Sequence, residues 1–259
     1  MIRGIQTAAS AMRTQMARQE VLAMNMANYA TPGYKQEYAP VDGISLCVDR
    51  VARDSQQRFA LLGSSLPEIG SLGTDVGVAR VEVDFRQAPL EETHRPLDVA
   101  LEGDGFLEVR TPEGDCYSRG GALHLDASNR LVTDEGYFVL GPDGQPLTLG
   151  SGTVSVDRHG TISVEGGGIG QLSVVEFEPG TLLAKLGNGL YTPDNPDVAP
   201  PMRAVNTVVR QGFLERSNVD HISTMTEMLS GLRAYQASQR MLLAQDELLG
   251  QAVNAVGRV

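Results

Sequence analysis

The side chains best suited to chemistry are spread along this chain of 259 residues without a known catalytic or metal-binding spacing. The four histidines, His94, His124, His159 and His221, lie far apart, and the sequence holds no HExxH pair and no Cys/His ligand set. It also lacks the GxSxG nucleophile elbow and the GxxxxGK[ST] phosphate loop. The sequence therefore predicts no catalytic residue and no bound cofactor.

Acidic residues gather at two places, but neither has the spacing of a site. Glu102, Asp104 and Glu108 flank a glycine-rich turn, and because their spacing matches no EF-hand loop, we expect a solvated turn there and no calcium. Glu91 and Glu92 are adjacent and are expected to be surface charge, since nothing marks them as an acid/base pair. We therefore expect no metal site and no enzymatic activity.

The net charge of −11 argues against nucleic acid as a partner, because phosphate binding requires clustered Lys and Arg. No window approaches eighteen uninterrupted apolar residues, so we expect no insertion into a membrane. Arg3, Gln6, Arg13 and Gln15 interrupt any apolar core of a signal peptide, so a cleaved signal is not expected. Composition alone leaves the compartment open.

The two cysteines, Cys47 and Cys116, lie in very different sequence contexts. They could form one disulfide, but two free or buried thiols are the favoured interpretation. Their redox state is otherwise open.

An amphipathic helix is predicted within residues 1–35. Its apolar residues recur at spacings of three and four, interrupted at Gln19, which is the pattern of a helix that packs on another helix. The segment Ala30-Thr31-Pro32-Gly33-Tyr34 follows, and we expect Pro32 and Gly33 to set the exit from the helix. The predicted seam consists of Ile2, Ile5, Ala9, Met12, Met16, Ala23 and Met26.

A second helical pattern, from Ile222 to Val253, supplies the partner that the first helix needs. Ser217, Asn218 and Asp220 are candidate N-cap residues, and we expect Ser217 or Asn218 to serve. Two polar seam positions, Gln239 and Asp246, are of the kind that sets register. Its apolar positions are Met225, Met228, Leu229, Leu232, Tyr235, Leu242, Leu243, Leu249 and Val253. The two helices could form a hairpin within one monomer, or their stripes could pack between subunits; the pattern leaves both open.

The middle of the chain is predicted to be β-rich and mainly antiparallel. Short alternating runs are separated by turn residues such as Asp143-Gly144. The expected strands lie at 81–85, 97–101, 106–109, 123–125, 137–140, 147–149, 154–156, 162–164 and 172–177, with a turn expected at Gly166-Gly167-Gly168. The fold class is thus α+β. Its expected domains are a coiled-coil-like terminal helical domain (1–35 with 212–259), an extended linker that could hold a short helix at 48–62 (36–77), and the β-rich domain (78–211).

Three motif blocks resemble those of bacterial flagellar rod and hook proteins. Residues 25–35, NMANYATPGYK, closely resemble the family signature NNLANxxTPGFK. Residues 212–220 are similar to its GxLExSNV motif, and residues 95–106 look like the central PLDxAIxGxGFF block of the FlgF and FlgG rod proteins. The chain departs at Met24 and Met26, where the family commonly has Asn and Leu. FlgF-like and FlgG-like members are hard to separate on these residues.

The resemblance implies a structural subunit of the flagellar basal-body rod, which transmits torque from motor to hook. It implies helical self-polymerisation, contacts with other rod proteins and the hook, and passage through the surrounding bushing ring. Export by the flagellar type III apparatus without a cleaved signal is also implied, with termini that order only when subunits meet. The residues implied in assembly are Ile5, Ala9, Met12, Met16, Asn25, Met26, Asn28, Thr31, Pro32, Gly33, Tyr34, Gly212, Leu214, Ser217, Asn218, Val219, Met225, Met228, Leu232, Tyr235, Leu242 and Leu249.

Two alternatives from other classes stay open at this point. One is a periplasmic or surface enzyme acting on cell-wall glycan, which requires a cleft with two convergent carboxylates. The other is an adhesin-like binding module, which requires a ligand groove; in both, the helices would form an oligomerisation stalk. Under the rod interpretation, deleting residues 1–35 is expected to abolish assembly and leave the β domain folded.

Overall fold

The computed structural model describes residues 2–44, 75–78, 80–150, 152–165, 167–178, 180–194 and 200–256. The chain forms two compact units, each assembled from segments far apart in the sequence. The first unit comprises Met1–Met26, Glu37–Glu82 and Asp220–Val259, and the second comprises Ala27–Gln36 and Val83–Val219. The expected terminal helices and the expected antiparallel, β-rich middle are both confirmed.

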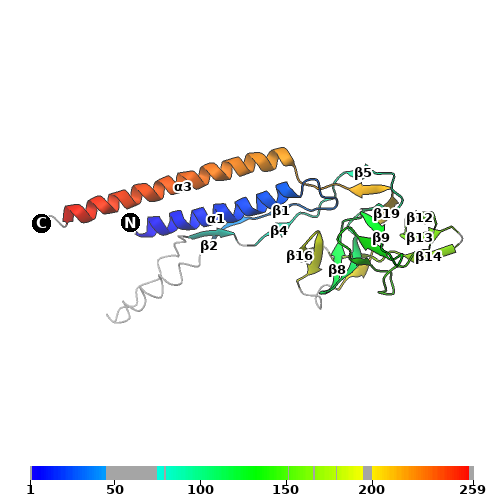
Figure 1. Cartoon of the computed structure of the whole chain (residues 1–259). Helices are drawn as coiled ribbons and strands as arrows, with labels where there is room; N and C mark the ends of the chain where they lie inside the picture. The colour runs from blue at the N-terminus through cyan, green and yellow to red at the C-terminus, as the bar shows by residue number, and fades with distance from the viewer. Residues whose placement is uncertain are drawn as a thin grey trace, which may run out of the picture. The chain divides into compact units, whose positions relative to one another are not determined.

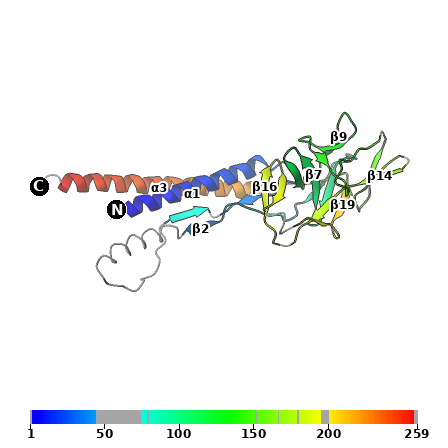
Figure 2. The ribbon, with the colours of Figure 1, turned by 90° about the horizontal axis from the view of Figure 1, so that it is seen from below.

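The first unit is built on a pair of helices from the two ends of the chain, α1 (Ile2–Ala27) and α3 (His221–Val256). Figures 1 and 2 show them side by side, blue and orange-red, with the two termini at the same end of the pair. Arg18 Nη2 lies 3.2 Å from Glu227 Oε2, and Gln19 Nε2 donates a hydrogen bond of 2.9 Å to the Met228 carbonyl. The two helices therefore pack on each other within one chain.

Short strands accompany the helices. They are β1 (Glu37–Tyr38), β2 (Val41–Ile44), β3 (Asp75–Val78) and β4 (Glu82–Val83). β2 pairs antiparallel with β3, and β1 pairs with β4. The described part of 36–77 is thus largely extended and paired, whereas the short helix expected at 48–62 lies outside the described residues.

The second unit contains the antiparallel strands of the middle region. The largest sheet has nine strands, with the order β16-β17-β8-β7-β11-β10-β9 and with β15 joining β7 to β18. A three-stranded sheet β12-β13-β14 and the pairs β19-β6 and β20-β5 complete the described strands. Their bounds are β5 (Leu90–Glu92), β6 (Val99–Glu102), β7 (Phe106–Thr111), β8 (Gly114–Ser118), β9 (Leu123–Leu125), β10 (Leu131–Thr133), β11 (Phe138–Val139), β12 (Val154–Val156), β13 (Thr161–Val164), β14 (Gly167–Gln171), β15 (Val174–Glu176), β16 (Leu183–Gly187), β17 (Leu190–Pro193), β18 (Met202–Arg203), β19 (Val208–Gln211) and β20 (Phe213–Glu215).

Several strand assignments in the second unit differ from the sequence prediction, which did not include β5, β8, β10, β14 or β16–β20. Residues 147–149 form no strand; Thr148 makes only an isolated bridge to Arg130, although Leu149 is buried in the core. The expected glycine turn is wrong at Gly167, which begins β14, because glycine gives no side-chain periodicity to read. The β16–β17 hairpin was missed despite its Asn188-Gly189 turn, where both residues have positive φ (49° and 68°), the typical two-residue hairpin signal.

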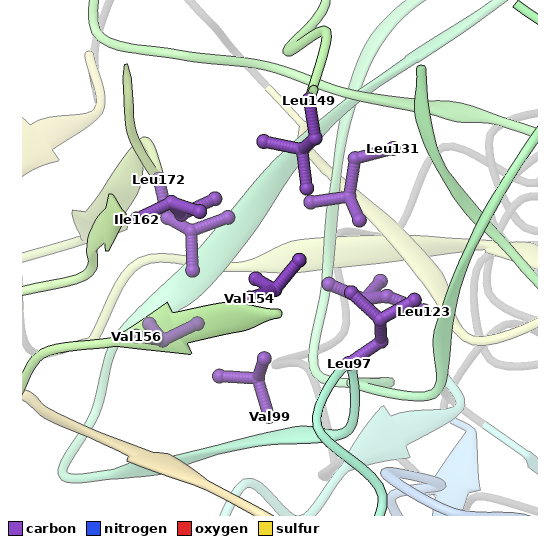
Figure 3. Close-up of a pocket in the computed structure, with 9 residues that line it drawn as sticks. All are labelled: Leu97, Val99, Leu123, Leu131, Leu149, Val154, Val156, Ile162 and Leu172. Carbon is purple, nitrogen blue, oxygen red and sulfur yellow. The ribbon is translucent and has the colours of Figure 1, made fainter. Parts of the chain in front are cut away.

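Two hydrophobic clusters hold the second unit together. The larger is aliphatic and includes Leu107, Val109 and Val139, each 0% exposed. It encloses a small cavity of about 10 Å³, for which Figure 3 shows nine lining side chains, all of them Leu, Val or Ile. The smaller cluster is aromatic, with Phe106 and Tyr191 in edge-to-face contact at 5.9 Å between ring centroids. Cys116 is a buried free thiol of the larger cluster, and Cys47 lies outside the described residues.

Candidate assembly site: the junction of the N- and C-terminal motifs

Asn25, in the last turns of α1, anchors the chain that returns after the turn. Its side chain is fully buried, and its Oδ1 accepts a hydrogen bond of 2.9 Å from the Glu37 amide while its Nδ2 donates to the Glu37 carbonyl. One side-chain amide thus satisfies both backbone groups of a residue twelve positions away. Asn28 has a local role, since its carbonyl accepts a hydrogen bond of 3.1 Å from the Thr31 amide.

Gly33 is required by a close backbone approach in the second unit. Its φ is +70°, and a Cβ placed there would lie 2.6 Å from the backbone of Arg119 and Gly120. The Gly33 amide donates a hydrogen bond of 2.7 Å to the Glu215 carbonyl, which joins the N-terminal motif to the C-terminal one. Pro32 is exposed, and α1 already ends at Ala27, so proline does not itself terminate the helix.

A buried cluster of three charged side chains lies beside this contact. Lys35 Nζ is 2.7 Å from Glu215 Oε1, and Arg119 Nη1 is 3.5 Å from Glu215 Oε2. All three side chains are at most 1% exposed. Lys35 Nζ also donates to the Arg86 carbonyl at 2.9 Å, and the Ala88 amide donates to Glu215 Oε1 at 2.8 Å. The carboxylate therefore receives hydrogen bonds from two segments.

Burial works against both cations of this cluster. It lowers the pKa of Lys35 from its usual value, and the charge and hydrogen bond of Glu215 only partly oppose this. Burial likewise lowers the pKa of Arg119, with the Glu215 charge opposing. The Arg119 guanidinium lies 4.9 Å from the centroid of the Phe106 ring, a cation–π contact that offsets part of its desolvation. Two cations thus share one carboxylate in the interior.

Asn218 of the C-terminal motif ties two further segments together. Its Oδ1 accepts a hydrogen bond of 2.6 Å from the Gln36 amide, and its Nδ2 donates to the Asp84 carbonyl at 2.8 Å. The Asp84 amide in turn donates to the Gln36 carbonyl at 2.8 Å. A hydrogen bond from the Arg86 side chain lowers the pKa of Asp84, so this carboxylate stays charged.

The remaining motif residues lie around this junction. Tyr34 is 3% exposed, and the Lys185 ammonium lies 3.8 Å from the centroid of its ring. Gly212 has φ +77° and donates to the Asp98 carbonyl at 2.8 Å. Thr31 is exposed, and the side chains of Leu214 and Val219 are half-buried.

The prediction that Ser217 or Asn218 caps α3 is wrong, because Asp220 does so. The Ile222 amide donates to Asp220 Oδ1 at 3.1 Å, and the Thr224 amide donates to the Asp220 carbonyl at 2.9 Å. Ser217 Oγ instead accepts from the Val219 amide at 3.3 Å. Asn218 is occupied by the segments described above, since tertiary partners compete with local capping.

α3 carries two lines of residues at heptad-like spacing. The inner line is buried or half-buried and consists of Thr224, Met228, Gly231, Tyr235, Ser238, Leu242, Gln245, Leu249 and Ala252. A Cβ on Gly231 would lie 3.6 Å from Gln15 Oε1 and 3.8 Å from Gln19 Nε2, so this line faces α1. The second line, here called the outer stripe, is exposed and consists of Ile222, Met225, Leu229, Leu232, Leu243 and Val253, with exposed fractions of 44–74%.

The predicted seams divide between these environments. On α3, Met228, Tyr235, Leu242 and Leu249 belong to the inner line, and Met225 and Leu232 belong to the outer stripe. Gln239 and Asp246 are exposed, on the same side as the outer stripe. On α1, Ile5, Ala9, Met12 and Met26 are half-buried, whereas Met16 is 52% exposed. The sequence pattern alone did not separate the two faces, because they lie one residue, about 100°, apart on the helix.

The described residues show no cluster of three or more His, Cys, Asp or Glu that could hold a metal ion. Within the same ranges, no helix combines the length and apolarity needed to cross a membrane. The cavity in the aliphatic core is lined by hydrocarbon side chains alone, so it does not supply the paired carboxylates of a glycan-cleaving site.

Comparisons with known proteins agree with this arrangement. Three family models match in chain order: "Flagella basal body rod protein" at residues 5–35, "Flagellar hook protein FlgE/F/G D1 domain" at 100–164, and "Flagellar basal body rod FlgEFG protein C-terminal" at 210–255. Together these models define the class of protein: a structural protein of the flagellar rod and hook.

Individual relatives are similar over nearly the whole chain. The flagellar hook-basal body complex protein FlhO of Bacillus subtilis (strain 168) is 32% identical over 276 residues, which cover 100% of both chains. The flagellar basal-body rod protein FlgG of the same organism is 31% identical over 98% of this chain and 99% of its own. FlgF of Caulobacter vibrioides is 30% identical over 93% and 92%. The chain belongs to the bacterial flagellar basal-body rod protein family, and the resemblance seen in its motifs is confirmed.

Proposed function

We propose that this chain is a structural subunit of the flagellar basal-body rod and polymerises helically with copies of itself. Several relatives are named as flagellar basal-body rod proteins, and membership of this structural family means that the chain is not an enzyme. Its place is the flagellum. The wall-glycan enzyme and the adhesin-like module have no support in the family.

The outer stripe of α3 is the observation that carries self-assembly. Its six apolar side chains lie exposed; the first four, up to Leu232, follow at spacings of three and four that allow packing against another helix, and Leu243 and Val253 lie further along α3. Covering a leucine or isoleucine side chain fully contributes roughly 1.5–3 kcal/mol. Burial of this stripe against a second helix is therefore strongly favourable. In a polymer, that helix belongs to a neighbouring copy of the chain.

Coiled-coil-like packing of α1 on α3 is part of the proposal. The alternating spacing of four and three along the inner line supports it, as does the close approach at Gly231. Gln239 and Asp246, on the side of the outer stripe, are then placed to set register between subunits, at a cost in stability.

Further partners follow from family membership alone. We propose that other rod proteins and the hook bind the two ends of the polymer, which transmits torque from motor to hook. The flagellar type III export apparatus and the bushing ring around the rod are proposed partners on the same basis. Proximal and distal positions are both compatible with the relatives, since FlgF and FlgG proteins match similarly.

The test places charge in the outer stripe without disturbing the inner line. Leu229→Glu and Leu232→Glu, at 59% and 44% exposed positions, should leave the monomer folded, because neither side chain is in the core. Polymerisation, followed by sedimentation and electron microscopy, should be lost, and swimming should not be restored in a strain lacking the gene.

Ser230→Glu is the matched control, since it places the same charge at the neighbouring exposed position outside the stripe. It should polymerise much better than the two stripe variants. Normal polymerisation of Leu229→Glu and Leu232→Glu would refute the role of the stripe.

A further inference from the structure

The two motifs that mark the ends of this chain meet at a single carboxylate. Lys35 and Glu215 are 180 positions apart, yet their charged atoms are 2.7 Å apart and their side chains 0% and 1% exposed. Lys35 lies in the segment that follows α1, and Glu215 ends β20, the last strand before α3. Both residues belong to the second unit.

We propose that Lys35, Glu215 and Arg119 form a charge latch that joins the segment after α1 to the segment before α3, with Glu215 as the positioning residue. The latch rests on the proposed function in one respect: the two chain segments that it joins continue into the helices that assemble. α1 ends eight residues before Lys35 and α3 begins six residues after Glu215, so the latch brings the segment that follows α1 next to the segment that precedes α3.

Glu215 is the critical residue of the latch, because in the described part of the chain it is the single carboxylate that pairs with both buried cations. With Glu215 ionised, two cations and one carboxylate are buried together; without it, two cations remain in the interior. Among the described residues, three other carboxylates act on these cations only through their charge, Asp84 on Lys35 and Asp104 and Glu176 on Arg119, whereas Glu215 forms the ion pairs. Removing one partner of a buried pair leaves an uncompensated charge, which is strongly unfavourable.

Glu215 and the nearby Asn218 also hold the backbone around the latch. Glu215 Oε1 accepts from the Ala88 amide at 2.8 Å, and the Glu215 carbonyl accepts from the Gly33 amide at 2.7 Å. Asn218, three residues further on, accepts from the Gln36 amide at 2.6 Å. The Ala88 amide therefore reports directly on the latch carboxylate, and the Gly33 and Gln36 amides report on the backbone contacts beside it.

The latch also requires that the N-terminal and the C-terminal motif are present in the same chain. Until residue 215 is present, Lys35 has no buried anion to pair with, so a chain that lacks the C-terminal motif cannot bury its N-terminal one at low cost. The second unit can therefore close at low cost only in a chain that carries both Lys35, after α1, and Glu215, before α3.

Hydrogen exchange on the full-length chain tests the latch. In Glu215→Gln, the Gly33, Ala88 and Gln36 amides should lose about 100-fold or more of their protection, while the Val109 amide in the core stays protected. Lys35→Met should be milder, since it leaves Arg119 and Glu215 as a one-to-one pair. Lys35→Met combined with Glu215→Gln should regain part of the lost protection. The reason is that the double variant buries one cation fewer than Glu215→Gln alone, whereas a loss of packing would not be reversed by a second substitution.

Glu102→Gln is the matched control, because its carboxylate forms an ion pair of 2.6 Å with Arg210 that is about half exposed on both sides. It should leave the three amides unchanged. Equal protection in Glu215→Gln and Glu102→Gln would overturn the latch, and so would an absence of rescue in the double variant. If Glu215→Gln does not fold, Lys35→Met alone must still lower protection at Gly33 and Ala88, or the latch is overturned. The stripe variants leave the latch intact, so failure of the proposed function and failure of the latch are distinguishable.

Discussion

Gly33 shows how a single residue of the N-terminal motif is determined by the second unit. Its positive φ and its contact with the backbone of Arg119 and Gly120 both exclude a side chain. Gly136 has a similar φ, +85°, but a Cβ there would have nothing within 4 Å. Comparing Gly33 with Gly136 therefore separates the cost of the left-handed conformation from the cost of a steric clash.

Gly33→Ala should therefore destabilise much more than Gly136→Ala. The left-handed conformation costs an L-residue about 1–2 kcal/mol, which is all that Gly136→Ala should show. At Gly33 the displaced backbone adds roughly 1–3 kcal/mol more. Urea unfolding of both variants would measure the difference, and equal stability would mean that the close approach does not matter.

Tyr117 provides a prediction for alkaline pH. Burial, with the nearby charges of Glu108 and Asp115, raises the pKa of Tyr117 from 10.0 to about 12. The folded state therefore keeps the phenol proton that the unfolded state loses above pH 10. The stabilisation is complete below pH 10 and is lost as the pH rises toward 12.

Tyr117→Phe should flatten this part of the stability profile. Unfolding free energies of the wild type and the variant, measured at intervals from pH 9 to pH 12, should converge as the pH rises if the variant is the less stable at pH 9. Lys35 shifts in the opposite direction, since its lowered pKa makes the unfolded state bind more protons, but it is common to both proteins. Parallel profiles would contradict the assignment to Tyr117.

At the scale of elements, α3 begins with a cap that the motif itself did not reveal. Asp220 supplies the side-chain acceptor, while Ser217 and Asn218 of the recognised motif face other partners. A cap and a motif can thus overlap in sequence and still serve different elements.

Asp220→Ala should destabilise the start of α3 by about 1 kcal/mol, the typical value for an N-cap. Ser217→Ala should have a smaller effect on the helix, because its hydroxyl bonds the Val219 amide outside it. Hydrogen exchange of the Ile222 amide compares the two variants. A larger loss of protection in Ser217→Ala would refute the cap assignment.

At the scale of the whole molecule, the division into units changes how the N-terminus should be truncated. Residues Ala27–Gln36 belong to the second unit, where Lys35 pairs with Glu215. Deleting 1–35, which was expected to leave the β domain folded, would remove the latch lysine and the Gly33 contact as well.

A deletion of residues 2–24 should separate assembly from folding. It removes most of α1 and keeps the segment that packs in the second unit. We expect polymerisation and swimming to be lost while the thermal unfolding of the β-rich unit is preserved. The longer deletion, 2–35, should lower that unfolding temperature too. Swimming supported by the shorter deletion would refute a role for α1 in assembly.

Much of the fold was readable because local chemistry decides it. Apolar spacing of three and four predicts helices at both ends, and runs such as Ile162–Val164 alternate as strands do. Gly167 was assigned to a turn because glycine carries no side-chain pattern, and the β16–β17 hairpin was missed because β16 does not alternate between buried and exposed residues.

The sequence by itself determined the terminal helices, the antiparallel middle and the family, since each depends on local periodicity or on motifs contiguous in the chain. Only the tertiary structure decided which apolar line of α3 faces α1, and that Lys35, Arg119 and Glu215 share one buried site. The reason is physical: ion pairs and close backbone contacts between residues 180 or more positions apart depend on how the chain returns upon itself, which no local pattern encodes.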